Sequence, residues 1–487
     1  MSQLEKYFEQ FRKHIIGIDQ TFNSPLGEKK IVYADWVASG RLYRPIEEKI
    51  INDFGPFTGN THTDTNVTGT LMTQAYHESH QIIKDHVNAG KDDVIITAGF
   101  GMTTAINKFQ RILGLKIPEQ LRPYISLPEE KRPVVFLTHM EHHSNQTSWL
   151  ETIADVVVIE PNEEGLVNYS HFEELLEKYK KREFKIGSFT AASNVTGAIP
   201  DYYRLARMMH ERGGFCFVDF AMAAPYVEIN MHPENESEGL DAIFFSPHKF
   251  LGGPGSAGVL IFNSKLYNRT VPDHPGGGTV EWTNPWGGHK YFEEIELRED
   301  GGTPGFLQSI KAALAIKLKE KMGVKNILAR EEELLKISYD KITGVEKLHL
   351  LANNVRNRLG VLSFYVENVH YNLIVKLLND YYGIQVRGGC SCAGTYGHYL
   401  LHIDPTRSKK ITEKINRHDL SEKPGWVRLS LHPTMTNEEI NVILNAIEDI
   451  IVNIDRYSED YNYSKATNEF IHKNGDDYSM RDNWFKL

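Results

Sequence analysis

Cysteine is scarce in this sequence, with only Cys216, Cys390 and Cys392 among 487 residues. Three thiols cannot form a disulfide framework for a chain of this length, so a reducing compartment is expected. Cys390 and Cys392 are too close in sequence to form an easy disulfide, and two ligands do not make a metal site. Taken alone, the pair is typical of two small buried residues.

Long apolar runs and an excess of basic charge are also missing. No window has the length of uninterrupted apolar residues that crosses a membrane. The 64 acidic residues outnumber the 54 basic ones, and the formal charge of −10 argues against nucleic acid as the main partner. The start, MSQLEKYFEQFRKHIIGIDQ, is typical of an amphipathic helix and lacks the apolar core of a signal peptide, so we expect a cytoplasmic protein.

Short apolar runs alternate with helix-like segments between about residues 90 and 265. Runs of this kind are typical of strands that are buried on both faces. Seven of them occur: DVIITAG, VVFLTH, DVVVIE, KIGSFTAAS, FCFVDF, DAIFFS and AGVLIF. The pattern predicts an α/β fold in which a mostly parallel seven-stranded sheet is flanked by helices, with a ligand at the carboxyl ends of the strands.

The pattern restarts after the helix-like stretch GTPGFLQSIKAALAIKLKEKMG as strand, helix, strand, strand and helix, which predicts a small α+β domain. We expect an N-terminal helical segment over 1–30 that packs with the small domain and a large domain over 31–325. The small domain is expected over 326–455 and a surface extension over 456–487. The segment 267–300, rich in Gly, Pro and Trp, is expected to be a long ordered loop.

A lysine stands at the end of one predicted strand, in DAIFFSPHKFLGGPGSAGVLIF. Lys249 must be paired, neutral or covalently used there, because burying an unpaired ammonium is too costly. A single lysine beside glycines is more often a surface residue at a turn. Ser246 and His248 precede this one, however, and both can donate hydrogen bonds to an anionic group.

Other predicted strands end in chemically active residues too. FCFVDFAMAAPY ends its strand in Asp219, which is either a turn former or a counter-ion for a cation. TAGFGMTTAINKF supplies a small-residue turn and a helix that begins near Thr103, where free backbone N–H groups would hold a phosphate.

Histidines cluster at the end of a further strand, in FLTHMEHHSN. A metal site is the rival interpretation of this cluster, but it lacks the i, i+4 helical spacing of a zinc protease. An amine, a carboxylate, a phosphate cradle and a flat-ring platform at one edge of a sheet are together what pyridoxal phosphate requires. Its aldehyde forms a Schiff base with a lysine, and a carboxylate keeps its ring nitrogen protonated.

The order and spacing of these motifs resemble the fold-type I pyridoxal-phosphate enzymes. The resemblance is to the class V aminotransferase family, and in particular to its cysteine desulfurase and selenocysteine lyase branch. By this resemblance, SPHK makes Lys249 the Schiff-base lysine, with Ser246 and His248 on the phosphate. EHHSN makes His142 the ring-stacking residue, and VDFAM makes Asp219 the partner of the pyridine nitrogen.

The resemblance, which extends from about residue 30 to residue 455, also implies how the phosphate is held. GMTTAIN implies that Thr103 and the backbone amides of Gly101 and Met102 form the phosphate turn. GGTPGF resembles the stretch whose threonine, here Thr303, reaches the phosphate in the neighbouring subunit, which implies a homodimer with shared sites.

Substrate-binding residues follow from the same resemblance. ASNVTG brings Asn194 towards the substrate carboxylate, and WVRLSLHPTMT makes Arg428 its bidentate clamp, with Arg387 as a further substrate-binding residue. IQVRGGCSCAG resembles the desulfurase loop that carries the nucleophilic cysteine. Counting five residues on from Arg387 assigns this role to Cys392, and the choice over Cys390 rests on spacing alone.

Two departures from the desulfurase pattern occur. Met222 stands where a glutamine usually donates a hydrogen bond to the phenolic oxygen of the cofactor, and a thioether cannot donate that bond. GGCSCAG also lacks the histidines that commonly precede the cysteine. The first departure weakens the transfer of desulfurase activity more than that of fold or cofactor, and the second leaves the assignment of Cys392 over Cys390 resting on spacing alone.

The function favoured by the sequence is removal of sulfur or selenium from an amino acid, giving alanine, with Cys392 as nucleophile and a sulfur-acceptor protein as a further partner. Transamination is the alternative, followed by a lyase or epimerase that uses no cysteine. A non-catalytic binding module on the same fold is the alternative from a different class.

Overall fold

The structure is a computed structural model that describes residues 1–486. The chain forms two compact units. Unit 1 comprises residues 1–38, 194–198 and 325–487, and unit 2 comprises residues 39–193 and 199–324. Over residues 1–486, no helix has the length and apolar character needed to cross a membrane.

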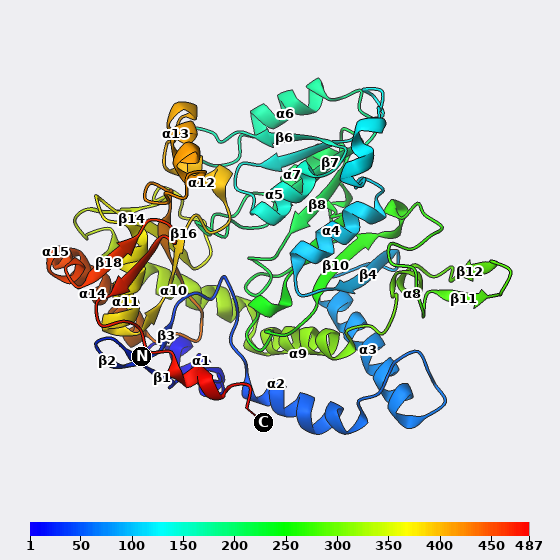
Figure 1. Ribbon diagram of the computed structural model, residues 1–487. Helices are drawn as coiled ribbons and strands as arrows, with labels where there is room; N and C mark the ends of the chain where they lie inside the picture. Colours follow the sequence, from blue (N-terminus) through cyan, green and yellow to red (C-terminus); the bar gives the residue numbers. More distant parts are fainter. Residues whose placement is uncertain (487) are drawn as a thin grey trace. The chain divides into compact units, whose positions relative to one another are not determined.

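Unit 2 is built on a seven-stranded sheet with the strand order β4-β10-β9-β8-β7-β5-β6 (Figure 1). The strands are β4 (Asp93–Ala98), β5 (Val134–Thr138), β6 (Asp155–Ile159), β7 (Lys185–Thr190), β8 (Phe215–Asp219), β9 (Ala242–Phe245) and β10 (Gly258–Asn263). Strand β10 is antiparallel to both of its neighbours, and all other pairs are parallel. The prediction of seven strands in a mostly parallel sheet is confirmed.

Helices cover both faces of this sheet. Ile186 and Phe217 pack in one hydrophobic cluster with Phe109 of α4 and Trp149 of α5. Successive side chains of a strand point to opposite faces. Gly187 therefore faces the other side, where a Cβ atom would lie 3.0 Å from Met209 of α7. The helices of unit 2 are α2 (Arg44–Lys49), α3 (Val67–His86), α4 (Met102–Ile112), α5 (His143–Leu150), α6 (Tyr169–Lys178), α7 (Tyr202–His210), α8 (Ile295–Glu299) and α9 (Phe306–Met322).

The segment 267–300 is more regular than predicted. It contains a hairpin, β11 (Val280–Thr283) with β12 (His289–Tyr291), and helix α8. The side chain of Asn284 accepts hydrogen bonds from the backbone N–H groups of Trp286 and Gly288, and Gly287 has a φ of +90°. Turn chemistry of this kind closes a hairpin without an alternating apolar pattern in its strands.

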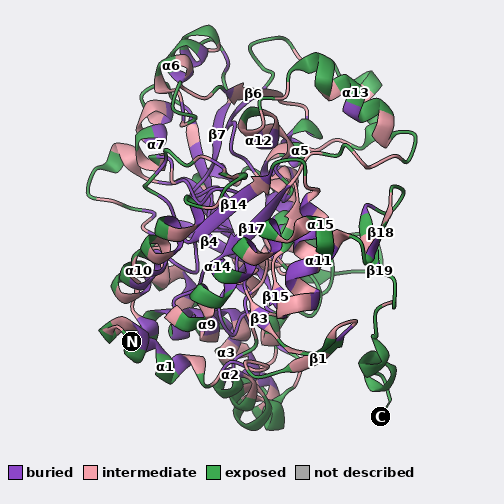
Figure 2. Ribbon diagram, turned by 90° about the vertical axis from the view of Figure 1, so that its left-hand side faces the viewer, coloured by how far each residue is buried: buried purple, intermediate pink, exposed green. Residues whose placement is uncertain are grey.

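Unit 1 contains a four-stranded antiparallel sheet with the order β13-β14-β17-β16. Strand β3 (Val32–Tyr33) pairs with β15 (Ile384–Gln385), which joins the N-terminal segment to this unit. The sheet strands are β13 (Leu348–Leu350), β14 (Val361–Val366), β16 (Arg387–Gly389) and β17 (Trp426–Ser430), and the outer hairpins are β1 (Thr21–Ser24) with β2 (Gly27–Lys30) and β18 (Tyr461–Ser464) with β19 (Glu469–His472). Figure 2 shows the strands β14 and β17 as buried.

The helix ends of unit 1 follow local sequence signals. The Thr436 side chain and the Glu439 side chain form a reciprocal capping box at the start of α14, and Gly383 ends α11 in the left-handed conformation. The helices are α1 (Gln3–Arg12), α10 (Val324–Ile342), α11 (Tyr371–Tyr382), α12 (Gly394–Leu400), α13 (Pro405–Ile415), α14 (Asn437–Val452) and α15 (Ile454–Ser458).

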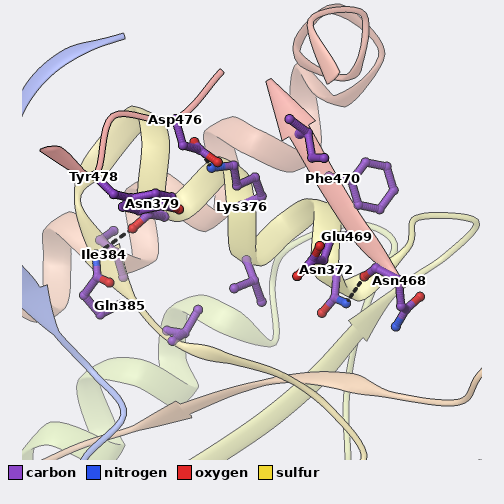
Figure 3. A pocket seen from close by; sticks show the side chains of 13 residues that line it. Asn372, Lys376, Asn379, Ile384, Gln385, Asn468, Glu469, Phe470, Asp476 and Tyr478 are labelled. Atoms are coloured by element: carbon purple, nitrogen blue, oxygen red, sulfur yellow. Dashed lines mark hydrogen bonds and ion pairs between the residues drawn. The ribbon is translucent and has the colours of Figure 1, made fainter. Parts of the chain in front are cut away.

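The C-terminal hairpin β18–β19 lines a cavity of about 530 Å³ together with α11 and β15 (Figure 3). The Asp380 carboxylate of α11 is fully buried beside this cavity. It accepts a hydrogen bond of 2.9 Å from the Tyr461 hydroxyl and lies 3.2 Å from the Lys376 ammonium, which also pairs with Asp476. One buried charge thus attaches the C-terminal segment to α11.

We expect Asp380→Ala to lower the free energy of unfolding by about 3 kcal/mol, because it leaves the buried Tyr461 hydroxyl without its acceptor and removes the buried carboxylate that the Lys376 ammonium contacts. Asp476→Ala is the matched control, since its carboxylate is 21% exposed and the expected loss is at most about 1 kcal/mol. Urea unfolding monitored by circular dichroism measures both. Equal losses in the two variants would contradict this account of the attachment.

Candidate active site

The carboxyl ends of five strands of unit 2 lie along one edge of its sheet. Strands β5, β7, β8 and β9 are parallel, and β4 shares their direction because β10 is antiparallel to both β4 and β9. The residues that follow these strands are therefore brought together, as the sequence predicted for a ligand site.

A cradle of polar groups forms around the turn where β4 leads into α4. Gly101 caps α4 without a side chain, and the backbone N–H of Met102 donates to Ser246 Oγ at 2.8 Å. A Cβ atom on Gly101 would lie 3.0 Å from Ser246 Oγ and 2.9 Å from Cε1 of His248. His248 Nδ1 donates to the Phe100 carbonyl at 2.8 Å, and burial lowers the pKa of this histidine. The cradle fits an anion, which would raise that pKa again.

A second helix begins beside α4. The hydroxyls of Thr103, in the first turn of α4, and Ser144, in the first turn of α5, lie 2.7 Å apart. His142 caps α5, and its Nδ1 accepts the backbone N–H of Ser144 at 3.1 Å. Sequence reasoning missed Ser144, although a hydroxyl in the first turn of a helix is a recognisable signal.

The carboxylate of Asp219 lies at the end of β8 and is 3% exposed. Burial raises the pKa of Asp219 to about 6, while a hydrogen bond from the Ala221 N–H and the charge of Lys249 act in the opposite direction. Lys249 ends the short helical turn Pro247–Lys249 that follows β9. A buried carboxylate and an amine within electrostatic range of each other fit the ring nitrogen and the aldehyde of pyridoxal phosphate.

Glu141 is a further buried carboxylate, whose role sequence reasoning missed. Its Oε1 accepts hydrogen bonds from the Thr138 hydroxyl at 2.6 Å and the Thr190 N–H at 3.0 Å, and its Oε2 accepts one from Asn145 at 2.7 Å. Burial raises the pKa of Glu141 to about 7, against these hydrogen bonds. Glu141 thereby links β5, β7 and α5 and fixes the backbone on which His142 stands.

In unit 1, a carboxylate absent from the sequence prediction bridges the two predicted arginines. Asp35 Oδ1 lies 2.8 Å from an Nη atom of Arg428, and its Oδ2 lies 3.0 Å from Nε of Arg387. Burial lowers the pKa of Arg428, and Asp35 opposes this shift. Asp35 follows the short strand β3. Both of its arginine partners are more than 350 residues away in sequence, so no local pattern reveals them.

Three buried polar atoms in this part of unit 1 have no hydrogen-bond partner among residues 1–486: Asn194 Oδ1, Ser391 Oγ and Arg428 Nε. The residues themselves are connected, because Asn194 Nδ2 donates to the Ser391 carbonyl at 2.7 Å and Arg428 donates to the Asn194 carbonyl at 3.1 Å. Two of the atoms are donors and one is an acceptor. Such a group fits a small polar ligand that carries a carboxylate.

The two neighbouring cysteines occupy a tight turn between β16 and α12. Ser391 and Cys392 both have left-handed backbone, with φ of +50° and +56°, and the Cys390 carbonyl accepts the N–H of Ala393 at 3.0 Å. Cys392 is exposed and Cys390 is half-buried. The Cys392 thiol lies within electrostatic range of the Arg428 guanidinium.

Thr303 and Met222, which the sequence also singled out, have different surroundings. Thr303 is exposed in a glycine-rich loop, in which the Gly302 N–H donates to the Gly277 carbonyl at 2.8 Å. Met222 is 4% exposed. Its thioether offers no proton to a ligand.

The Aminotransferase class-V family model matches residues 32–443, which is most of the chain. The chain belongs to the class V aminotransferase family. The members of this family are pyridoxal-phosphate-dependent enzymes.

Curated members of the family include relatives named as desulfurases. A probable cysteine desulfurase of Halalkalibacterium halodurans is 28% identical over 389 residues, which cover 79% of this chain and 88% of the relative. A cysteine desulfurase of Haloferax volcanii is 26% identical over 370 residues, covering 74% and 80%. The solved structure of a cysteine desulfurase from Thermococcus onnurineus superposes with a TM-score of 0.73 at 24% identity, covering 91% of this chain and 98% of that one. It confirms the fold.

We expect Asp219→Asn to stabilise the cofactor-free protein at pH 8. The folded-state pKa of Asp219, about 6, lies above the usual 3.8, so wild type loses stability as the pH rises between these values. The variant should therefore be more stable by about 3 kcal/mol at pH 8 and nearly equal to wild type at pH 4. Urea unfolding at the two pH values measures the difference.

Asp241→Asn is a control for which the opposite change in stability is expected. Burial would raise the pKa of Asp241, but hydrogen bonds from His210 and Lys265 lower it overall. This variant should be less stable than wild type at pH 8. A pH-independent effect of Asp219→Asn would contradict the raised pKa of Asp219.

Proposed function

We propose that unit 2 binds pyridoxal phosphate. Lys249 holds the cofactor covalently, and the phosphate is held by Ser246, His248, Thr103 and the N–H groups of Gly101 and Met102. Support comes from the close-packed cradle around Gly101 and from the carboxylate buried within electrostatic range of Lys249. When bound, pyridoxal phosphate withdraws electrons from the substrate Cα and so makes its proton removable.

The chain's own residues then have separate tasks. Asp219 stays ionised and holds the proton of the ring nitrogen, and His142 lies against the face of the ring. Lys249 takes the proton from the substrate Cα. In unit 1, Arg428, Asn194 and Arg387 bind the substrate carboxylate, which the unpartnered Arg428 Nε supports.

We further propose that the reaction is removal of sulfur or selenium from an amino acid such as L-cysteine, giving alanine. The observation that carries this proposal is the exposed Cys392 on a tight turn, with its thiol near the Arg428 guanidinium. The Cys392 thiolate attacks the substrate sulfur and retains it as a persulfide. Cys390 is half-buried, and it lies near the phenol of Tyr371.

Transamination remains the second candidate, and Met222 favours it because the desulfurase pattern has a glutamine there. In that reaction Lys249 returns the proton to the cofactor carbon, and neither cysteine takes part. We also propose a homodimer in which the exposed Thr303 serves the phosphate of the neighbouring subunit. A sulfur-acceptor protein and a cytoplasmic location complete the proposal.

The direct test is the production of alanine and sulfide from L-cysteine in the presence of excess dithiol. We expect the yellow wild-type protein to be active and Cys392→Ala to lose activity by at least about a hundred-fold, because it lacks the nucleophile. Cys390→Ala should retain activity, since the dithiol accepts sulfur directly from Cys392. Lys249→Ala should not hold the cofactor covalently after borohydride treatment.

Each outcome separates the candidates. An inactive wild type whose absorption band shifts with other amino acids would instead support transamination. Activity that survives in Cys392→Ala but disappears in Cys390→Ala would reverse the assignment of the nucleophile.

We expect Asp35→Asn to raise the KM for L-cysteine roughly ten-fold, which corresponds to about 1.5 kcal/mol for a lost charge-assisted hydrogen bond. Asp35 orients both Arg428 and Arg387 without contacting the reacting atoms, so kcat should change less. Asp35→Glu keeps the charge and should restore part of the affinity. A lower KM in Asp35→Asn would mean that Asp35 competes with the substrate carboxylate for the arginines.

A further inference from the structure

The turn between β16 and α12 carries two thiols rather than one. A turn closed by a hydrogen bond from residue i+3 to residue i brings the Cα atoms of these residues within about 7 Å. The bond from the Ala393 N–H to the Cys390 carbonyl closes such a turn, and Cys392 lies inside it. A residue outside the turn also holds the backbone of the turn, because Asn194 donates a hydrogen bond of 2.7 Å to the Ser391 carbonyl.

The two thiols have different surroundings. Cys392 is exposed and lies within electrostatic range of Arg428. Cys390 is half-buried and interacts with the phenol of Tyr371, a 7% exposed residue. Burial raises the pKa of Tyr371, so the phenol keeps its proton, and its oxygen accepts a hydrogen bond of 2.9 Å from Asn468 of the C-terminal segment.

The backbone just before Cys390 is closely packed on one side. A Cβ atom on Gly425, the residue before β17, would lie 2.9 Å from Cα of Gly389 and 2.5 Å from the Tyr371 ring. Cys390 is half-buried and Cys392 is exposed, so a sulfur atom on Cys392 is the more open of the two to solvent thiols.

We propose that Cys390 is a second sulfur carrier, which takes the persulfide sulfur from Cys392 within the same turn. This rests on the proposed desulfurase function. The Cys390 thiolate attacks the outer sulfur of the Cys392 persulfide, a new sulfur–sulfur bond forms at Cys390, and the old bond breaks with its electron pair on Cys392. Cys392 leaves as thiolate, so the step consumes no oxidant or reductant.

The transfer resets the nucleophile while the chain retains the sulfur. Cys392 is then free to react with a second substrate molecule before any acceptor arrives. Attack by Cys390 on the inner sulfur would instead require a disulfide between residues two apart, whose geometry is strained. The turn thus favours passing the sulfur on over expelling it as sulfide.

The experiment is a burst measurement on the pyridoxal-phosphate-loaded enzyme with excess L-cysteine as the only thiol, and the amplitude is read before the slower turnover in which L-cysteine itself accepts sulfur. We expect about two alanine molecules and two cyanide-labile sulfur atoms per wild-type chain, and about one of each in Cys390→Ala. Cys390→Ser keeps a side chain of similar size, so it controls for a packing defect in Cys390→Ala. The two variants should give the same burst. Cys216→Ala is the matched control, because Cys216 is fully buried in β8, and it should keep the wild-type stoichiometry.

Alkylation and mass mapping locate the sulfur. A persulfide on Cys390 that depends on Cys392 supports the relay. One sulfur atom per wild-type chain, or an equal burst in wild type and both Cys390 variants, overturns the relay while leaving desulfurase activity intact. A wild type that releases no alanine overturns the proposed function, and the relay with it.

Discussion

Asp219 holds a carboxylate at the buried end of β8, where desolvation raises its pKa to about 6. A buried carboxylate is costly unless a cation stabilises its charge, and the charge of Lys249, from the turn after β9, acts on Asp219 in this way. The parallel order of β8 and β9 is what brings the two residues to the same edge. The sheet therefore places a buried carboxylate and an amine within electrostatic range of each other.

In unit 1, too, a buried charge is placed beside an opposite charge. Arg428 is 3% exposed on strand β17, and burying its guanidinium is costly unless a carboxylate pairs with it. Asp35 supplies it and also contacts Arg387, so one carboxylate orients two cations. The Arg428 Nε–H has no acceptor among residues 1–486. The ion pair with Asp35 therefore neutralises the buried guanidinium without using all of its hydrogen-bond donors. A second carboxylate can still bind.

Sequence patterns predicted the elements and the ends of the strands, but not the contacts between distant segments. The seven apolar runs and the capping box at Thr436 are local signals, and the structure has each of them. Asp35 escaped notice because its partners lie on distant strands, and a lone carboxylate after a strand is also typical of a turn. The role of Glu141 was missed because it depends on the Thr190 N–H of another strand as well as on the nearby Thr138 and Asn145. The hairpin within 267–300 was missed because Asn284 and Gly287 form its turn without a strand-like apolar pattern.

Backbone strain bears on the choice between the two candidate reactions. Two consecutive non-glycine residues with left-handed backbone, Ser391 and Cys392, cost on the order of 1–3 kcal/mol each and persist only where the surroundings enforce them. The Asn194 bond to Ser391 and the turn bond to Cys390 provide that enforcement. Transamination uses no thiol and gains nothing from this strain. Desulfuration needs an exposed sulfur near Arg428, and the strained turn holds one there. The strained turn therefore favours desulfuration over transamination despite Met222.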